Sequence, residues 1–113
     1  MLAIPYPIKY TARMIEIEVI QSATFEKWFE GLKDGQAVAR INARIRRLTI
    51  GHFGDAKPVR AGISELRIDC GPGYRVYFMR RGAIIVVLLA GGDKSTQDRD
   101  IKCAIEIAEE WKE

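Results

Sequence analysis

Residues 65–78, with the sequence ELRIDCGPGYRVYF, constrain the fold more than any other stretch of the chain. Apolar and polar residues alternate on both sides of a Gly-Pro-Gly segment at residues 71–73. This is the pattern of two short strands joined by a tight turn. Because side chains alternate between the two faces of a strand, the sequence predicts a β-hairpin with one face toward the core and one polar face.

The predicted polar face of the hairpin carries two arginines. If Leu66 and its same-parity neighbours face the core, Glu65 and Arg67 share the opposite face with Arg75 and Tyr77. The guanidinium fork matches the geometry of a phosphate or a carboxylate, so Arg67 and Arg75 form a candidate anion site. The alternative is a simple ion pair between Arg67 and a nearby carboxylate, which is common on sheet surfaces.

The rest of the pattern predicts an α+β domain of β-α-α-β-β-β-α order. A chain of 113 residues has the length of a single domain. The sheet is expected to be small and mainly antiparallel, packed with an N-terminal helical hairpin and a C-terminal helix. The predicted elements are a strand at 15–20, a helix capped by Ser22 or Thr24 that runs to Leu32, a helix at 36–50, strands at 64–70, 74–79 and 83–90, and a helix capped by Ser95 or Thr96 that reaches Trp111.

Three further segments carry expectations about the path of the chain. Residues 83–90 are apolar throughout, which is typical of a strand covered on both faces, and the two glycines at 91–92 are expected to end it. Residues 51–64 are predicted to be a loop, with a short strand around Val59 and Arg60 as the alternative. Residues 1–13 lack the pattern of a signal peptide and are expected to be an extension or arm before a domain at 14–113.

Basic residues are concentrated in the middle of the chain. Residues 40–67 hold seven basic residues and two acidic ones, whereas residues 93–113 hold four basic and seven acidic ones. Arg40, Arg44 and Arg47 recur at helical spacing and form one face of the second predicted helix. This charge predicts contact with a polyanion such as RNA, with Lys57 and Arg60 as further contacts. A solvated helix face is the alternative.

The sequence offers few other chemical groups for a reaction. It has no nucleophile motif and no metal-ligand cluster, so neither a metal nor a cofactor is expected. Cys70 and Cys103 are expected to be free thiols in a reducing cytoplasm, and no apolar run approaches the ~20 residues of a membrane span. What remains is metal-free cleavage of RNA, in which the 2′-hydroxyl of the substrate is the nucleophile.

Two more residues are candidates for such a site. Lys94 precedes the last predicted helix, whose free N–H groups and dipole favour anions, although a capped turn with an exposed lysine is an equal alternative. His52 is the only histidine of the chain. Histidine is the usual general base near neutral pH, but a lone loop histidine is more often an ordinary exposed residue.

The order of the predicted elements, together with ELRI, GPGYRVYF and LLAGGDKSTQDRDI, resembles the RelE/ParE toxin superfamily. Within it, the HigB-like, phage-derived addiction module killer proteins are the most similar branch, and the resemblance covers nearly all of the chain from Met14 onward. It implies a RelE-like fold and a cytoplasmic toxin of a type II toxin–antitoxin module. It also implies a small helix-turn-helix antitoxin, encoded by the adjacent gene, as the partner that silences the toxin.

Many members of this superfamily cut mRNA in the ribosomal A site, and others, of the ParE type, poison DNA gyrase. The resemblance therefore implies a metal-independent mRNA endonuclease. A non-enzymatic gyrase inhibitor, or a degenerate member that only binds its antitoxin, are the alternatives.

The resemblance also implies roles for individual residues. Arg75 matches the arginine of the GYR motif that contacts the scissile phosphate in the mRNA-cutting members. Arg67 and Lys94 fall at or near positions that are basic in those members. Glu65 stands where some relatives have a lysine, and the C-terminal helix lacks the tyrosine found in some of them. The candidates for proton transfer are Glu65, His52 and Tyr77, while the basic helix face at Arg40, Arg44 and Arg47 would suit ribosomal RNA.

Overall fold

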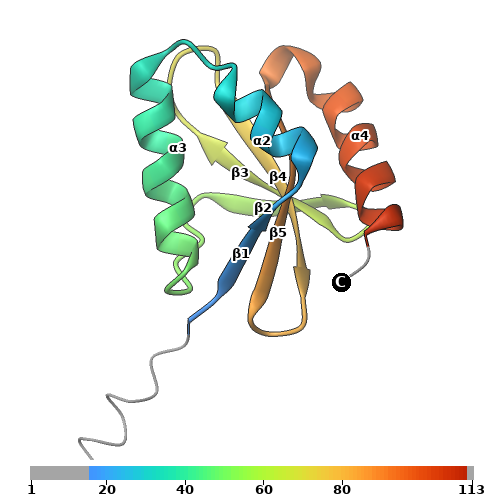
Figure 1. Cartoon of the computed structure of the whole chain (residues 1–113). Helices are drawn as coiled ribbons and strands as arrows, with labels where there is room; N and C mark the ends of the chain where they lie inside the picture. Colours follow the sequence, from blue (N-terminus) through green and yellow to red (C-terminus); the bar gives the residue numbers. More distant parts are fainter. Residues whose placement is uncertain (1–15, 112–113) are drawn as a thin grey trace, which may run out of the picture.

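The computed structural model describes residues 16–111, so the predicted arm at 1–13 lies outside the described residues (Figure 1). The described part is an α+β domain with a five-stranded mixed sheet and three helices, which confirms the predicted fold class. The elements are β1 (Glu18–Gln21), α2 (Ala23–Glu30), α3 (Gly35–Leu48), β2 (Ala56–Arg60), β3 (Ile63–Ile68), β4 (Tyr74–Arg81), β5 (Ile85–Asp93), a 3₁₀ turn (Lys94–Thr96) and α4 (Gln97–Glu110).

The strands lie side by side in the order β1-β5-β4-β3-β2. β1 pairs with β5 in parallel, and the other three pairings are antiparallel. The predicted hairpin is present as β3 and β4, joined by the turn at residues 71–73. Residues 16–111 contain one strand more than predicted, because β2 forms where a loop was expected and the short strand around Val59 was the alternative. The composition of this segment predicts a loop. Because β2 pairs with β3, its backbone N–H and C=O groups nevertheless find hydrogen-bond partners in the sheet.

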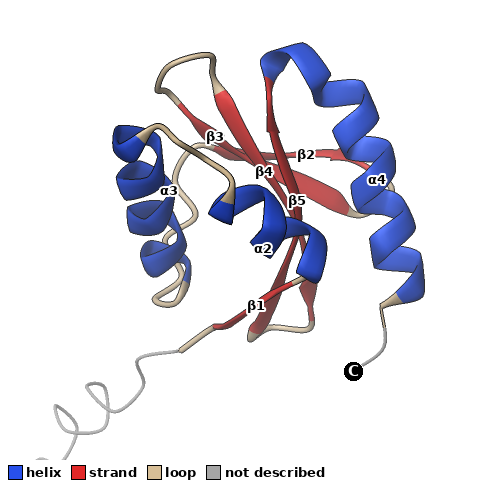
Figure 2. Ribbon diagram, turned by 45° about the horizontal axis from the view of Figure 1, so that its top comes forward, coloured by secondary structure: helices blue, strands red, loops and turns tan. Residues whose placement is uncertain are grey.

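Helices cover both faces of the sheet, with α2 and α3 on one side and α4 on the other (Figure 2). Leu66, Val76 and Phe78 pack toward α2 and α3, whereas Tyr77 and Met79 pack in a second cluster with Ala104 of α4. In β5 the four residues Val86, Val87, Leu88 and Leu89 are all fully buried. The prediction of a strand covered on both faces is therefore confirmed for β5.

Helices α2 and α3 begin at polar residues whose side chains cap the first turn, and α4 does not. Ser22, one of the two predicted caps of α2, accepts a hydrogen bond from Phe25 N and donates one to the carbonyl of Leu89, which ties the helix to β5. Thr96 occupies the N-cap position of α4, but its hydroxyl donates to the Asp100 carboxylate and makes no capping bond. The Asp93 side chain instead caps the preceding 3₁₀ turn by accepting from Ser95 N at 2.8 Å.

The two glycines at residues 91–92 do not end β5, as was expected, because the strand continues through them to Asp93. Neither glycine has a side chain, and side chains of α2 and α4 fill the space that a Cβ would need. A Cβ at Gly91 would overlap the indole of Trp28, coming within 2.6 Å of Cδ2, and a Cβ at Gly92 would overlap the carboxylate of Asp100. Glycine is needed here because α2 and α4 approach the backbone of β5 closely.

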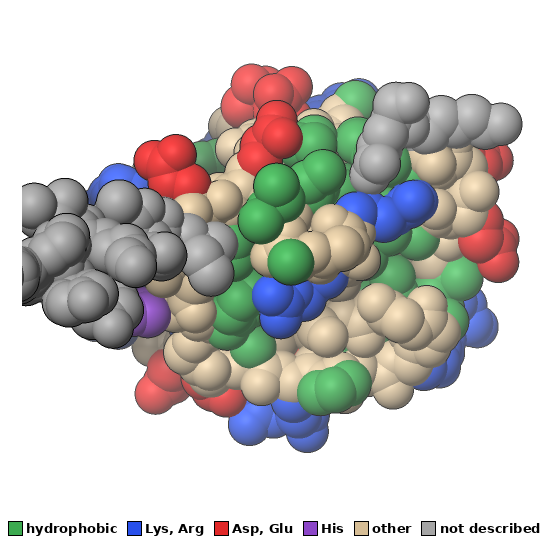
Figure 3. All heavy atoms as spheres, turned by 90° about the horizontal axis from the view of Figure 1, so that it is seen from below, with side chains coloured by type: hydrophobic (Ala, Val, Ile, Leu, Met, Phe, Trp, Pro, Cys, Tyr) green, Lys and Arg blue, Asp and Glu red, His purple; other side chains and the backbone are tan. Residues whose placement is uncertain are grey.

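At the end of the molecule opposite the 71–73 turn, hydrophobic side chains reach the surface between charged ones (Figure 3). The largest exposed apolar residues are Ile50 and Ile84, with 49% and 54% of their surface accessible. None of the helices within residues 16–111 combines the length and apolar character that crossing a membrane requires.

Candidate functional site

A hollow of about 400 Å³ lies at the end of the β3–β4 hairpin, and we call it the Arg67 groove. Its lining residues are Asp55, Arg67, Ile68, Asp69, Gly71, Pro72, Gly73, Arg75 and Lys94. Arg67 and Arg75 stand directly opposite each other in the register of β3 and β4, and Lys94 follows the end of β5. The structure therefore places three of the predicted site residues, Arg67, Arg75 and Lys94, around one hollow.

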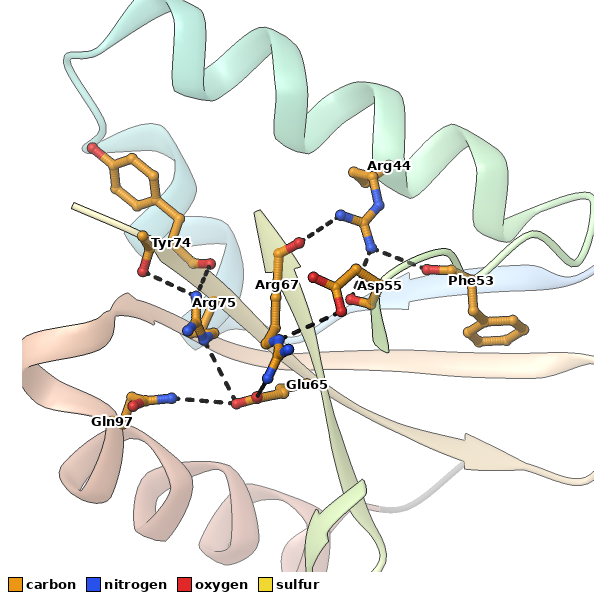
Figure 4. Close-up of polar contacts among 9 residues, drawn as sticks. Arg44, Phe53, Asp55, Glu65, Arg67, Tyr74, Arg75 and Gln97 are labelled. Carbon is orange, nitrogen blue, oxygen red and sulfur yellow. Dashed lines mark hydrogen bonds and ion pairs between the residues drawn. The ribbon is translucent and has the colours of Figure 1, made fainter. Parts of the chain in front are cut away.

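Glu65 lies beneath the two arginines and is shared between them (Figure 4). Its side chain is only 3% exposed, and its carboxylate oxygens lie 3.9 Å from Arg67 Nη1 and 3.8 Å from Arg75 Nε. The amide of Gln97 donates a hydrogen bond of 3.4 Å to Glu65 Oε1. A buried carboxylate needs such partners, because an unpaired charge in the interior is strongly destabilising.

Arg75 is nearly enclosed, with a side chain that is 12% exposed. Its Nη1 donates to the carbonyls of Gly73 and Tyr74 at 3.4 and 3.2 Å, which holds the guanidinium against the turn (Figure 4). Its Nε–H makes no hydrogen bond with any described residue, since Glu65 is at ion-pair distance only. Arg75 is therefore held in place with part of its hydrogen-bonding capacity unused.

Tyr77 does not share this polar surface, which corrects the prediction from the alternation of the hairpin. Its side chain is fully buried, because α4 covers the face of the sheet on which Glu65 and Tyr77 lie. Burial is the main cause that raises the pKa of the Tyr77 phenol to about 12, against the opposing effect of the nearby Gln97 amide. The hydroxyl thus stays protonated at neutral pH and lies near Gln97 and Glu65.

A second hollow of about 340 Å³ adjoins the Arg67 groove and shares four lining residues with it, Asp55, Arg67, Ile68 and Asp69. Arg40, Arg44 and Arg47 of α3 line its other side. Arg44 is engaged by the protein itself, because its guanidinium donates to three backbone carbonyls. Burial is the main cause that lowers the pKa of Arg44.

The charges around the Arg67 groove nearly cancel. Arg67, Arg75 and Lys94 are matched by the carboxylates of Asp55, Asp69 and the underlying Glu65. The excess of positive charge comes from the arginines of α3 in the adjoining hollow. A ligand that spans both hollows therefore meets a positive surface, whereas a small anion in the Arg67 groove alone does not.

The remaining predicted site residues lie outside the Arg67 groove. His52 is exposed and follows the end of α3, where its backbone N–H donates to the carbonyl of Arg47. Lys57 lines a smaller hollow of about 150 Å³ beside β2, and Arg60 lies 3.8 Å from the carboxylate of Asp98. Within residues 16–111 no group of His, Cys, Asp and Glu is arranged to hold a metal ion.

Sequence patterns gave no indication of two residues at this site, Asp55 and Gln97. Asp55 lies just before β2, and its carboxylate approaches Arg67 Nε at 3.4 Å (Figure 4). Gln97 is the first residue of α4 and reaches Glu65 from the other side. The first contact depends on the register of β2 against β3, and the second joins residues 32 positions apart through the docking of α4.

Comparison with known proteins finds a relative with a similar sequence. Over 94 residues the chain is 54% identical to an uncharacterized protein of Haemophilus influenzae, a match that covers 83% of this chain and 95% of the relative. The chain belongs to the family of that Haemophilus protein. The name of the relative states no activity, so membership of this family leaves the function to be inferred from the site.

Two further comparisons carry less weight. No protein-family model matches the sequence. A chain in the crystal structure of the toxin–antitoxin complex RelBE2 from Mycobacterium tuberculosis superposes with a TM-score of 0.49 at 21% identity, covering 74% of this chain and 97% of that chain. A likeness of this size carries no argument about function.

Proposed function

We propose that the chain is the toxin of a type II toxin–antitoxin module and that it cleaves mRNA on the ribosome without a metal. The observation that carries the proposal is the convergence of Arg67, Arg75 and Lys94 on one groove, with Glu65 buried beneath the two arginines. The resemblance of GPGYRVYF and LLAGGDKSTQDRDI to the RelE/ParE superfamily supports it.

The proposed reaction is a transesterification within the RNA. The 2′-oxygen attacks the adjacent phosphorus, the bond from phosphorus to the 5′-oxygen breaks, and a 2′,3′-cyclic phosphate and a 5′-hydroxyl result. Arg67 and Arg75 would stabilise the charge that develops on the phosphoryl oxygens. Lys94 would donate a proton to the departing 5′-oxygen, while a base accepts the proton of the 2′-hydroxyl.

Glu65 is the candidate base nearest the groove, because its carboxylate contacts Arg67 and Arg75 from beneath, although it does not line the groove itself. Tyr77 is enclosed and protonated, and His52 lies outside the groove lining, so both are weaker candidates for direct proton transfer. Arg40 and Arg47, which line the adjoining hollow, would bind neighbouring phosphates of the same RNA or of ribosomal RNA. Lys57 and Arg60 would extend this contact, whereas Arg44 is engaged by backbone carbonyls.

The same proposal includes a protein partner. We expect the adjacent gene to encode a small helix-turn-helix antitoxin that binds this chain in the cytoplasm and suppresses its activity. Co-expression of the two proteins should restore growth, and the pair should purify as one complex. A neighbouring gene of another kind, with no such complex, would contradict this part of the proposal.

Controlled expression with primer-extension mapping of transcripts tests the activity. Wild-type protein should arrest growth and cut mRNA in translated regions, while Arg75→Ala should slow cleavage by about 10²- to 10³-fold, as for loss of one transition-state donor. Arg75→Lys retains a charge beside Glu65 but lacks the fork geometry, so it should fold like the wild type and still cleave poorly. Arg99→Ala removes a 78% exposed arginine on α4 and should leave cleavage unchanged.

The outcomes separate the possible functions. Undiminished mRNA cleavage by a folded Arg75→Ala protein would refute the proposed role of Arg75. Inhibition of supercoiling by DNA gyrase, without mRNA cleavage, would indicate a non-enzymatic inhibitor instead. A chain that shows neither effect and binds only its antitoxin would be a degenerate member.

A further inference from the structure

Arg44 ties the loop before β2 to strand β3. Its Nη1 donates to the carbonyl of Arg67 at 2.7 Å, and its Nη2 donates to the carbonyls of Phe53 and Asp55 at 3.0 and 3.1 Å (Figure 4). The backbone N–H of Arg67 donates to the same Asp55 carbonyl at 2.9 Å. Arg44, Asp55 and Arg67 are thus joined in a closed set of hydrogen bonds that does not involve the Asp55 carboxylate.

The loop before β2 passes close to the Arg44 guanidinium at Gly54. Gly54 has a φ of +65°, a conformation that favours glycine, and a Cβ at this position would lie 3.2 Å from Arg44 Nη2. Hydrogen bonds from a charged donor are stronger than those between neutral groups, so the backbone of Asp55 is held firmly. In the structure its carboxylate lies at the side of the Arg67 guanidinium.

The Asp55 carboxylate lies where a ligand would bind. Its Oδ1 is 3.4 Å from Arg67 Nε, one of the donors in the fork that binds a phosphate. The two side chains are 60% and 36% exposed, and both line the Arg67 groove as well as the adjoining hollow. In the free protein, the Asp55 carboxylate therefore lies at ion-pair distance from a donor that a phosphate in the groove would use.

We propose that Asp55 is a specificity-determining residue of the Arg67 groove: an internal carboxylate that competes with the ligand for Arg67. The competition is modest, because an exposed ion pair is weak and can be displaced. A single small anion gains little by displacing Asp55, since the charges around the groove nearly cancel. A polyanion that also reaches Arg40 and Arg47 gains enough contacts to displace it, so Asp55 biases the groove toward polymers. The inference rests on the proposed nucleic-acid ligand but not on cleavage.

Binding of a short single-stranded DNA oligonucleotide, measured by fluorescence anisotropy, tests the proposal, because DNA lacks the 2′-hydroxyl and stays intact. Asp55→Asn keeps the backbone carbonyl that Arg44 and Arg67 use. This variant should bind roughly three- to tenfold tighter at low salt. Its dependence of log affinity on log salt should be steeper by about 0.7, the contribution of one additional phosphate contact on a single strand.

Two comparisons separate local competition from a general change in charge. Glu109→Gln adds the same net charge on α4, outside both hollows, and should alter affinity by less than about twofold at moderate salt because screening weakens distant charges. In an Arg67→Gln background the gain from Asp55→Asn should disappear, which is the signature of direct coupling. Inorganic phosphate should compete with the oligonucleotide more effectively in Asp55→Asn than in the wild type.

Several results would overturn the inference. These are unchanged or weaker binding by Asp55→Asn, an equal gain in Glu109→Gln, a gain that persists without Arg67, and absence of oligonucleotide binding in every variant. Failure of the proposed enzymatic function would look different. The chain could cut no mRNA and still show an increase in oligonucleotide affinity on Asp55→Asn that requires Arg67. That result would support Asp55 as a competitor and refute only the proposed nuclease activity.

Discussion

Replacement of Gly91 by alanine should destabilise the domain, because the indole of Trp28 fills the space that the new Cβ would need. Gly91 lies in the central part of the sheet, where β5 pairs with β4, and the indole of Trp28 lies directly over it. A Cβ would overlap three atoms of the ring, with Cδ2 at 2.6 Å. The ring cannot yield cheaply, because it also packs against Phe25 and Tyr74 with centroid distances of 5.7 and 6.3 Å.

The size of the effect follows from these contacts. Overpacking of a core costs about 1–3 kcal/mol of folding free energy, and displacement of Trp28 would add the loss of two aromatic contacts of about 0.5–1.5 kcal/mol each. We therefore expect Gly91→Ala to lower the free energy of unfolding by about 3 kcal/mol or more. Gly35→Ala is the matched control, since nothing lies within 4 Å of its Cβ position at the start of α3, and it should be neutral or stabilising by up to about 1 kcal/mol.

Urea unfolding of the two variants and the wild type, followed by far-UV circular dichroism, measures both changes. The double variant Trp28→Leu/Gly91→Ala should lose less stability than the two single losses added together, because the smaller side chain leaves room for the new methyl group. Equal stability of Gly91→Ala and wild type would refute the reasoning. So would strict additivity in the double variant, because the clash would then not involve Trp28.

Two further predictions concern the polar residues under α4. Because burial raises the pKa of Tyr77 from 10.0 to about 12, the folded protein retains a proton that the unfolded chain loses, so stability should fall as pH rises from about 10 to 12. Tyr77→Phe should reduce this alkaline loss and cost nothing at neutral pH, since the buried hydroxyl makes no hydrogen bond with any residue in the described part of the chain; urea midpoints across that pH range check it. Glu65→Gln should lower the free energy of unfolding by about 1–3 kcal/mol, because two arginines lose their buried counter-charge. Asp98→Asn, which breaks only exposed ion pairs, should change it by less than about 0.5 kcal/mol in the same urea experiment, and an equal loss in both would contradict the special role of Glu65.

Much of the fold could be predicted because its signals are local. The alternation that produces the β3–β4 hairpin and the cap at Ser22 both depend on residues within a few positions of one another. The prediction that β5 ends at Gly91 was wrong because the signal there is not local. Glycine usually ends a strand in a sequence pattern, but here its small size serves contact with Trp28, which lies far away along the chain.

The candidate site was predictable only in part, for the same reason. Register alone places Arg67 opposite Arg75, so the hairpin pattern was enough to bring these two together. Alternation also divides the hairpin into two faces, but it does not tell which face another element covers. The covering of Tyr77 by α4 depends on tertiary docking. The approach of Asp55 to Arg67 depends on the register of β2 against β3, in a segment whose composition predicted a loop.

Glu65 explains how two arginines can stand opposite each other at one groove. Like charges directly across neighbouring strands are destabilising, and Arg67 and Arg75 occupy such a pair of positions. A carboxylate beneath them offsets that repulsion and, because it is buried, leaves the exposed edges of the guanidinium groups available to a ligand. A lysine at this position would add a third positive charge under α4 without a counter-charge. A glutamate at this position is thus consistent with the proposed groove, in which the arginines would bind a phosphate and Glu65 keeps them side by side.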